Sequence, residues 1–126
     1  MPTGRLKTAS VYDPASTADG RRVLVTRYWP RGLSRARVAV DERRPELAPS
    51  RELLRAYQHE SLTWSEFARS YRREMRSPDA RAALKQLGER RRGGEAITLL
   101  CVCHSDELDE DRIHCHRRLL RQMLPG

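Results

Sequence analysis

The segment Ala96–Cys103, with the sequence AITLLCVC, constrains the fold more than any other part of this chain. A run this apolar predicts a strand that is central in a sheet and covered on both faces. A shorter apolar run, Val23-Leu24-Val25, predicts a second buried strand within Arg22–Trp29. Helical patterns lie between these two strands, so the order of the elements indicates a layered α/β domain.

The predicted sheet is short and is either parallel or mixed. Arg37–Asp41 alternates weakly and predicts a poorer strand. The connection between the first two strands is shorter than a dozen residues, which is little for a right-handed parallel crossover and leaves a mixed sheet open. The 126 residues fit a single compact domain, 1–126, with helices covering the sheet and with flexible ends at 1–4 and 125–126.

Helices are predicted from capping residues and apolar spacing. Ser50 is a typical N-cap for a helix over Arg51–Gln58. Thr63 and Glu66 form a capping box that opens a second helix, which runs through Arg76. Ser77-Pro78 opens a third helix, which Gly93-Gly94 ends. A final helix is indicated by an apolar face with Ile113, His116, Leu120 and Met123.

The second helix carries a stripe of large side chains at helical spacing: Trp64, Phe67, Tyr71 and Met75. Such a stripe can serve as a platform for stacking nucleic-acid bases. It is more typical of the core face of an amphipathic helix, and we predict the core role.

The distribution of charge is more informative than the net charge of +8. Of the 25 basic residues 23 are arginines, a bias typical of GC-rich genomes. The first 40 residues hold eight bases and two acids, whereas the rest of the chain is close to balanced. A localised surplus indicates an anion-binding site better than a global one does. The surplus lies on Arg21, Arg22, Arg27, Arg31, Arg35 and Arg37.

The first candidate site is Arg27-Tyr28-Trp29-Pro30-Arg31-Gly32, at the carboxyl end of a predicted buried strand. Ligands of open α/β sheets bind beyond the carboxyl ends of strands. Arg27 and Arg31 could hold a phosphate or carboxylate, the Trp29 ring could stack on a planar group, and Gly32 would let the backbone approach closely. The alternative is structural: an arginine paired with Asp13 or Asp41, and Trp29 as packing.

The remaining candidates lie in two short segments, Cys101-Val102-Cys103-His104 and His114-Cys115-His116-Arg117, which hold all three cysteines and three of the four histidines. One prediction is catalytic, with Cys115 as nucleophile, His116 as acid–base group and Arg117 in the anion clamp. Another is a zinc-like transition-metal site, although the spacing is not that of a standard zinc finger or ribbon. Its predicted ligands are Cys101, Cys103, His104 and His114. Inert buried cysteines are the third alternative.

The acidic run between these segments, Asp106–Asp111, is typical of a solvated loop, and it could also neutralise the arginines or bind a hard cation. No apolar run reaches the roughly 20 residues that span a bilayer. The N-terminus lacks the apolar region of a signal peptide, and an odd number of cysteines favours reduced thiols. We therefore expect a cytoplasmic protein without a membrane partner, whose oligomeric state does not follow from its sequence.

Several strings resemble the YeaO-like branch of domain-of-unknown-function family 488: VYDP at 11–14, DGRRVLVTRYWPRGLS at 19–34, ELAPS at 46–50 and SLTWSEFARSYRREM at 61–75. LLC at 99–101 and CHR at 115–117 resemble the broader family's pattern, with a longer interval between them here. The resemblance covers roughly residues 11–124. It implies a compact α/β domain whose two motifs converge at one sheet edge. It implies little about activity. Some relatives carry a methyltransferase label, but this sequence has no glycine-rich loop that would bind the cofactor of such an enzyme.

The leading prediction is a cleft in which Arg27, Trp29 and Arg31 face Cys101, Cys115, His116 and Arg117 and bind a small anionic ligand, phosphate-bearing or nucleotide-like. Whether the protein is an enzyme, and whether it takes a cofactor such as zinc, stays open. Nucleic-acid binding through Arg21, Arg22, Arg35 and Arg37 is an alternative that we do not favour, because the core requires the aromatic stripe.

Overall fold

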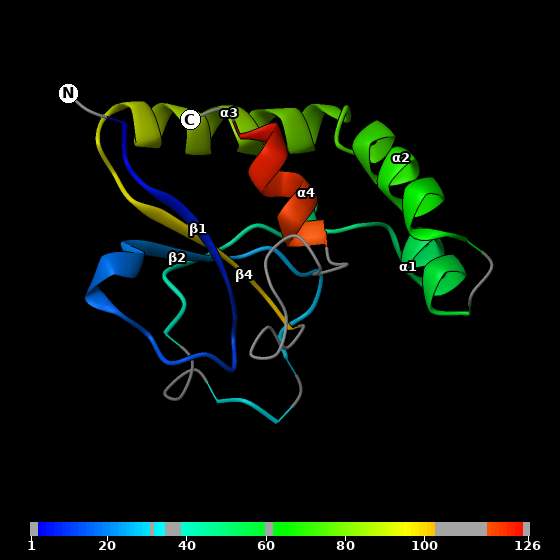
Figure 1. Cartoon of the computed structure of the whole chain (residues 1–126), viewed down its shortest axis with the longest axis horizontal. Helices are drawn as coiled ribbons and strands as arrows, with labels where there is room; N and C mark the ends of the chain where they lie inside the picture. Colours follow the sequence, from blue (N-terminus) through cyan, green and yellow to red (C-terminus); the bar gives the residue numbers. More distant parts are fainter. Residues whose placement is uncertain (1–2, 31, 35–38, 60–61, 103–115, 125–126) are drawn as a thin grey trace.

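The computed structural model describes residues 3–30, 32–34, 39–59, 62–102 and 116–124 (Figure 1). Within these ranges four strands form one sheet in the order β1-β4-β2-β3. All three pairings between neighbouring strands are parallel, so the parallel alternative holds. The strands are β1 (Leu6–Ser10), β2 (Arg21–Leu24), β3 (Glu42–Arg43) and β4 (Ile97–Cys101).

The short connection from β1 to β2 is compatible with a parallel sheet because it has little distance to cover. It runs from Val11 to Gly20 and passes β4, which lies between the two strands. Two strand spacings are about 10 Å and a five-residue strand is about 16 Å long, whereas ten extended residues reach about 33 Å. A single 3₁₀ turn, Thr17–Asp19, therefore replaces the usual crossover helix.

Strand β4 is the centre of the sheet, as its sequence predicts. All five of its residues are buried, and its backbone pairs with β1 on one side and β2 on the other. The weaker predicted strand over Arg37–Asp41 differs from the structure, in which β3 is Glu42–Arg43. Asp41 fixes this register, because its carboxylate accepts the Arg22 N–H at 2.8 Å and its own N–H donates to the Arg22 carbonyl at 2.9 Å. Positions 35–38 lie outside the described residues.

Helices cover one face of the sheet (Figure 1). Strand residues Leu6, Val23, Ile97 and Leu99 point to this face and share one core cluster with side chains of all the described helices. The helices are α1 (Arg51–Gln58), α2 (Trp64–Glu74), α3 (Pro78–Arg92) and α4 (His116–Met123). Ser50, Thr63 and Ser77 cap α1, α2 and α3, as predicted, and the Thr63–Glu66 capping box is formed.

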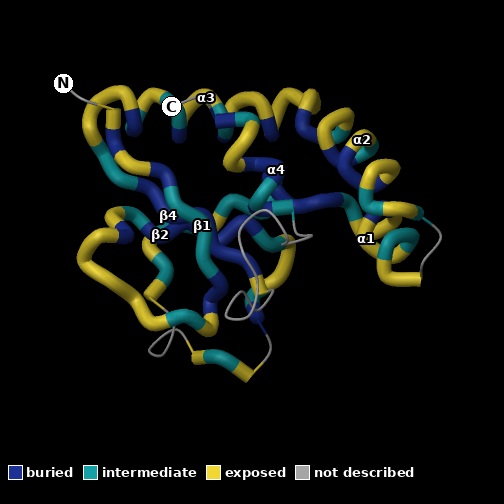
Figure 2. Tube along the Cα trace, viewed as in Figure 1, coloured by how far each residue is buried: buried dark blue, intermediate teal, exposed yellow. Residues whose placement is uncertain are grey.

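The aromatic stripe of α2 forms part of this core, as predicted. Phe67, Tyr71 and Met75 are buried, and Trp64 packs at the margin of the cluster. Figure 2 shows the buried trace running through the sheet and the inner sides of the helices.

Loops rather than helices cover the other face of the sheet. Its small apolar cluster consists of Val11, Leu24 and Leu100, with Trp29 packed against them. Beside it the carboxylate of Asp19 accepts from Lys7 at 2.6 Å and from the buried guanidinium of Arg22. Burial alone would raise the pKa of Asp19, but hydrogen bonds from Lys7, from the Ser16 backbone and from Arg22 outweigh it and hold this pKa below its ordinary value.

A buried arginine joins the two ends of the described chain. Arg91, near the end of α3, donates from Nε to the Gly4 carbonyl at 3.1 Å and from Nη1 to the Leu124 carbonyl at 3.3 Å. Desolvation lowers the pKa of this guanidinium. Among the described helices, none is both long enough and apolar enough to cross a bilayer.

Candidate functional site

A cleft of about 430 Å³ opens at the carboxyl edge of the sheet, where an open parallel sheet binds its ligands. The segment that follows β2, Thr26–Pro30, forms one wall, and Cys101 and Val102 at the end of β4 lie in the same cleft. Tyr12 follows β1, and residues of α1, the two residues Ala48 and Pro49 before it, and His116 of α4 complete the lining. The structure thus brings together four predicted site residues, Arg27, Trp29, Cys101 and His116.

The exposed apolar side chains of the protein gather at this cleft. Within the described ranges the large hydrophobic residues left exposed are Tyr12 at 47 %, Tyr28 at 62 %, Leu54 at 40 % and Val102 at 41 %. All four line the cleft. Exposed apolar surface that is concentrated in one concavity is typical of a binding site, whereas scattered single residues are not.

Two arginines give the cleft a positive charge. Arg27 and Arg51 are both exposed, and among the described lining residues there is no carboxylate. Arg27 donates to the Pro49 carbonyl at 3.3 Å. The carboxylates of Asp13 and Asp41, the alternative partners for this arginine, accept backbone N–H groups of Ser10 and Arg22.

Trp29 both packs against the protein and lines the cleft, the two roles that were predicted as alternatives. Its Nε1 donates to the Leu33 carbonyl at 2.6 Å, and the ring packs against the small apolar cluster. The guanidinium of Arg43 lies 5.8 Å from the ring centroid, and the ring also lines the cleft. These contacts hold the indole as a fixed wall. Gly32 has a φ of +76° and open space around it, and it is not a lining residue.

His116 and Cys101 lie where the helical face of the sheet meets the cleft. The Nε2 of His116 lies 2.8 Å from the Val25 carbonyl, and the imidazole meets the Tyr71 ring edge-on at a centroid distance of 5.7 Å. Tyr71 itself donates to the Leu47 carbonyl at 2.6 Å. Cys101 is buried and is not part of a disulfide. His116 is therefore held in a single orientation at the cleft.

Arg117 directly follows the lining residue His116 in the sequence, but its own side chain does not line the cleft. Its side chain is fully buried, and none of its guanidinium nitrogens has a hydrogen-bond partner in the described part of the chain. A predicted member of the anion clamp is thus a buried cation without a described counter-ion.

The other predicted site residues lie outside the described residues: Arg31, Cys103, His104, His114 and Cys115. In the part of the chain that is described, no group of three or more His, Cys, Asp or Glu side chains is arranged to hold a metal. The described arginines of the predicted nucleic-acid surface are in internal ion pairs, Arg21 with Glu95 at 2.6 Å and Arg22 with Asp19.

Among the lining residues that sequence reasoning missed are Tyr12 and Arg51, whereas Tyr28 was named in the first candidate segment without a role. Tyr12 comes two residues after β1 ends and Arg51 opens α1, so each was seen as the end of an element and not as part of a site. The available signal was that Tyr12, Tyr28 and Val102 all follow strands, and the carboxyl ends of parallel strands meet at one edge.

A parallel α/β domain with an aromatic and basic cleft at its carboxyl edge is the class that fold and site define. Residues 6–125 match the family described as the active DUF488-N3 subclade, and the chain belongs to this family. This confirms the resemblance inferred from the motifs.

The particular relatives are uncharacterised proteins. The chain is 43 % identical to YeaO of Escherichia coli over 65 residues, a segment that covers 52 % of this chain and 56 % of that protein. It is 37 % identical over 83 residues to proteins of Mycobacterium bovis and Mycobacterium tuberculosis, covering 66 % of this chain and 70 % of each of theirs. No solved structure matches the chain.

Proposed function

We propose that the cleft at the carboxyl edge binds a small anionic ligand that carries a phosphate and a planar group, as a nucleotide does. The observation that carries this proposal is the coincidence of two features: the exposed apolar side chains of the described residues gather where Arg27 and Arg51 lie, and no carboxylate is among the described lining residues. The volume of about 430 Å³ is within the roughly 300–1,000 Å³ of small-molecule sites.

The phosphate is assigned to the two arginines. A guanidinium binds phosphate with parallel hydrogen bonds, and none of the described residues that line this cleft is a carboxylate that would neutralise it. Arg51 lies in the first turn of α1, where the helix dipole adds a favourable potential for an anion.

The planar group is assigned to the aromatic wall. Trp29 is fixed by its hydrogen bond to Leu33 and by packing, so that stacking on it requires little ordering of the protein. Tyr12 and Tyr28 are exposed and enlarge the apolar surface on which a ring can lie.

The burial of Arg117, the residue after His116, supports the same assignment. A buried guanidinium that has no partner among the described residues is costly, and a negative charge nearby would offset that cost. We place Arg117 in the anion clamp with Arg27 and Arg31, and we keep Cys115 as nucleophile and His116 as acid–base group within this proposal.

The test is calorimetry and thermal melting of the full chain with adenosine monophosphate, inorganic phosphate and adenosine. Loss of one charge-assisted contact, in Arg27→Gln or Arg51→Gln, should weaken binding of adenosine monophosphate about 10- to 100-fold. Arg55→Gln is the matched control, because Arg55 is exposed on the same helix and does not line the cleft. A ligand at a hundred times its Kd should raise the free energy of unfolding by about 2.7 kcal/mol.

Two results would contradict the proposal. One is an unchanged melting temperature with all three compounds. The other is equal weakening by Arg51→Gln and Arg55→Gln, which would indicate a general effect of charge.

A further inference from the structure

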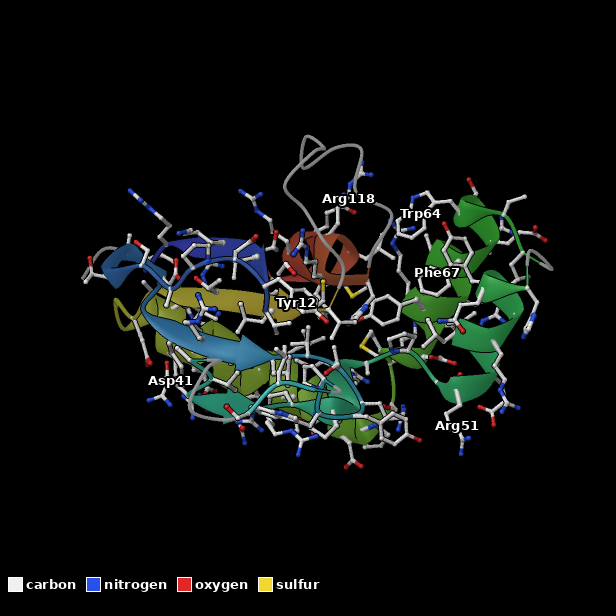
Figure 3. The ribbon with its side chains drawn as sticks, turned by 90° about the horizontal axis from the view of Figure 1, so that it is seen from below. Tyr12, Asp41, Arg51, Trp64, Phe67 and Arg118 are labelled. Atoms are coloured by element: carbon white, nitrogen blue, oxygen red, sulfur yellow. The ribbon has the colours of Figure 1, made fainter. Side chains whose placement is uncertain are left out.

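A second hollow lies between α2 and α4, away from the cleft at the carboxyl edge. It encloses about 500 Å³, and none of its lining residues lines the first cleft. In Figure 3 Trp64 of α2 and Arg118 of α4 lie on the same side of the molecule. We call it the α2–α4 groove. It is lined by Trp64, Ser65, Ala68, Arg69, Arg72, Arg73, Arg76, Arg118, Leu119 and Gln122.

Five of these ten lining residues are arginines. Four come from α2 and the turn after it, at positions 69, 72, 73 and 76. Side chains three and four residues apart lie on one face of a helix, so these four form a continuous row. Arg118 faces the row from α4, and Arg72 reaches across to Gln122 at 3.4 Å.

The charge of this row is not neutralised within the described part of the protein. Some arginines outside the groove are in ion pairs, as Arg21 is with Glu95 and Arg90 with Glu42. None of the five groove arginines makes an ion pair with a described residue, and no carboxylate is among the groove's lining residues.

Among the described acids, Glu66 interacts electrostatically with the groove arginine Arg69. The pKa of Glu66 is lowered, first by its hydrogen bond to the Thr63 backbone and last by the charge of Arg69. Its carboxylate accepts the Thr63 N–H at 3.0 Å, so it serves the helix cap. Five like charges in one groove repel each other, and a polyanion removes that repulsion.

We propose that the α2–α4 groove binds a short stretch of single-stranded nucleic acid. The arginine row supplies contacts for successive phosphates: positions 69 and 76 are seven residue steps apart, about 10 Å at the rise of a helix, enough for two or three phosphates of an extended strand. Arg118 closes the groove on the other side of the backbone.

An aromatic platform stands at one end of the arginine row. Trp64 stacks on Phe67 with ring centroids 5.4 Å apart and an interplanar angle of 19°, and its half-buried ring also lines the groove. A base can stack on an aromatic ring that is already fixed, and such stacking accepts any base. An aromatic platform beside a row of cations is the arrangement with which proteins bind single-stranded nucleic acid.

The concave shape distinguishes a single strand from a duplex. A double helix is about 20 Å wide and is read by a helix that protrudes into its groove. Here the arginines line a hollow between two helices and not a protruding helix, so we expect the groove to bind a single extended strand more tightly than a duplex.

The experiment is fluorescence anisotropy of the full chain with a labelled oligothymidine of about 12 nucleotides, repeated with a duplex and with polyglutamate. With about three phosphate contacts, affinity for the oligothymidine should fall about 20-fold between 50 and 200 mM salt. The variant Arg72→Gln/Arg76→Gln should bind at least tenfold more weakly and should show only about a threefold fall over that salt range. Arg118→Gln should weaken binding from the opposite wall.

The matched control is Arg81→Gln/Arg92→Gln, which removes two exposed charges from α3 outside the groove. It should bind the oligothymidine nearly as well as the unmodified chain, and so should Arg51→Gln, which belongs to the other cleft. Equal loss in the α3 control would overturn the proposal, since any surface charge would then suffice. Equal or tighter binding of duplex or polyglutamate would also overturn it.

Discussion

His116 Nε2 lies 2.8 Å from the carbonyl oxygen of Val25, so that the first residue of α4 is joined to the residue that follows β2. A carbonyl oxygen can only accept, and Nε2 therefore carries the proton of this bond. Val25 in turn donates its N–H to the Leu100 carbonyl at 3.0 Å. The orientation of the imidazole at the cleft is thus set by the sheet itself.

This bond should be visible in proton–nitrogen NMR spectra as a protected Nε2–H resonance of His116. His59, which is exposed at the end of α1, is the internal control, and its ring proton should exchange too fast to be seen. His116→Ala should lower the free energy of unfolding by about 1–3 kcal/mol, because the Val25 carbonyl loses its partner. A ring proton of His116 that exchanges as fast as that of His59 would contradict this assignment.

Tyr71→Phe tests the link between α2 and the segment before α1. The buried hydroxyl donates to the Leu47 carbonyl at 2.6 Å, and its loss leaves that carbonyl without this donor. We expect a loss of about 1–2 kcal/mol in the free energy of unfolding, measured by urea denaturation. Tyr28→Phe removes a hydroxyl from a residue that is 62 % exposed and should change stability by less than about 0.5 kcal/mol. Equal effects of the two substitutions would refute the role of the bond.

Asp19 should make stability sensitive to acid. Its pKa in the folded protein is below the ordinary value of 3.8, so its contribution is present above about pH 4 and is lost as the pH falls through the lowered value. Asp19→Asn should cost about 3 kcal/mol at pH 7, because Arg22 stays buried without its partner, and the difference from the unmodified chain should shrink below pH 4. Urea denaturation over a pH series measures this.

The control for Asp19 is Asp79→Asn, an identical change at an exposed position in the first turn of α3, with an expected cost below about 1 kcal/mol. A cost of Asp19→Asn that stays constant down to pH 2 would show that the Asp19 carboxylate is not the acid-sensitive group.

Gly20 and Gly32 should respond very differently to alanine. Both have a positive φ, +64° and +76°. A Cβ at Gly20 would lie 2.3 Å from the Ala96 carbonyl oxygen, whereas one at Gly32 would meet nothing within 4 Å. Gly32→Ala should therefore cost only the backbone strain of about 1–2 kcal/mol. Gly20→Ala should cost clearly more, since β2 and β4 must separate; equal shifts in melting temperature would contradict this.

The two tryptophans report separately on the two proposed sites. Trp29 lines the cleft at the carboxyl edge and Trp64 lines the α2–α4 groove. In Trp64→Phe, adenosine monophosphate should change the remaining fluorescence, whereas the oligothymidine should do so in Trp29→Phe. The crossed pairs of ligand and variant are the controls. A ligand that affects both variants equally would show that the sites are not separate.

The local parts of this fold were predictable because their causes are local. The start of α1 follows from the Ser50 cap and the start of α2 from the capping box of Thr63 and Glu66, whereas α2 ends at Glu74, before the predicted Arg76. The position of β3 was not predictable, because Asp41 sets it by bonding to Arg22, nineteen residues away. Long-range contacts also explain why the ion pairs of the arginines could not be predicted. Arg21 and Arg22 looked available in the sequence, but their partners Glu95 and Asp19 are assigned only by the folded chain.

The candidate site was predictable in part. The rule that ligands bind at the carboxyl edge brought Arg27, Trp29, Cys101 and His116 to one cleft. The arginine row of α2 was overlooked because residues 41–80 hold equal numbers of bases and acids. A count along the chain averages over the faces of a helix, and only the helical period separates the row from the acids around it.

The hydrogen bonds of Arg91 hold the two ends of the described chain close together. Residues 4 and 124 accept hydrogen bonds from one guanidinium. Detachment of either end exposes this guanidinium and weakens its hydrogen bond to the other end. Fraying at the two ends should therefore be coupled. A circular permutant that joins them by a short linker and opens the chain elsewhere would need little rearrangement. In such a permutant a covalent bond would take over the task that a single buried cation now performs.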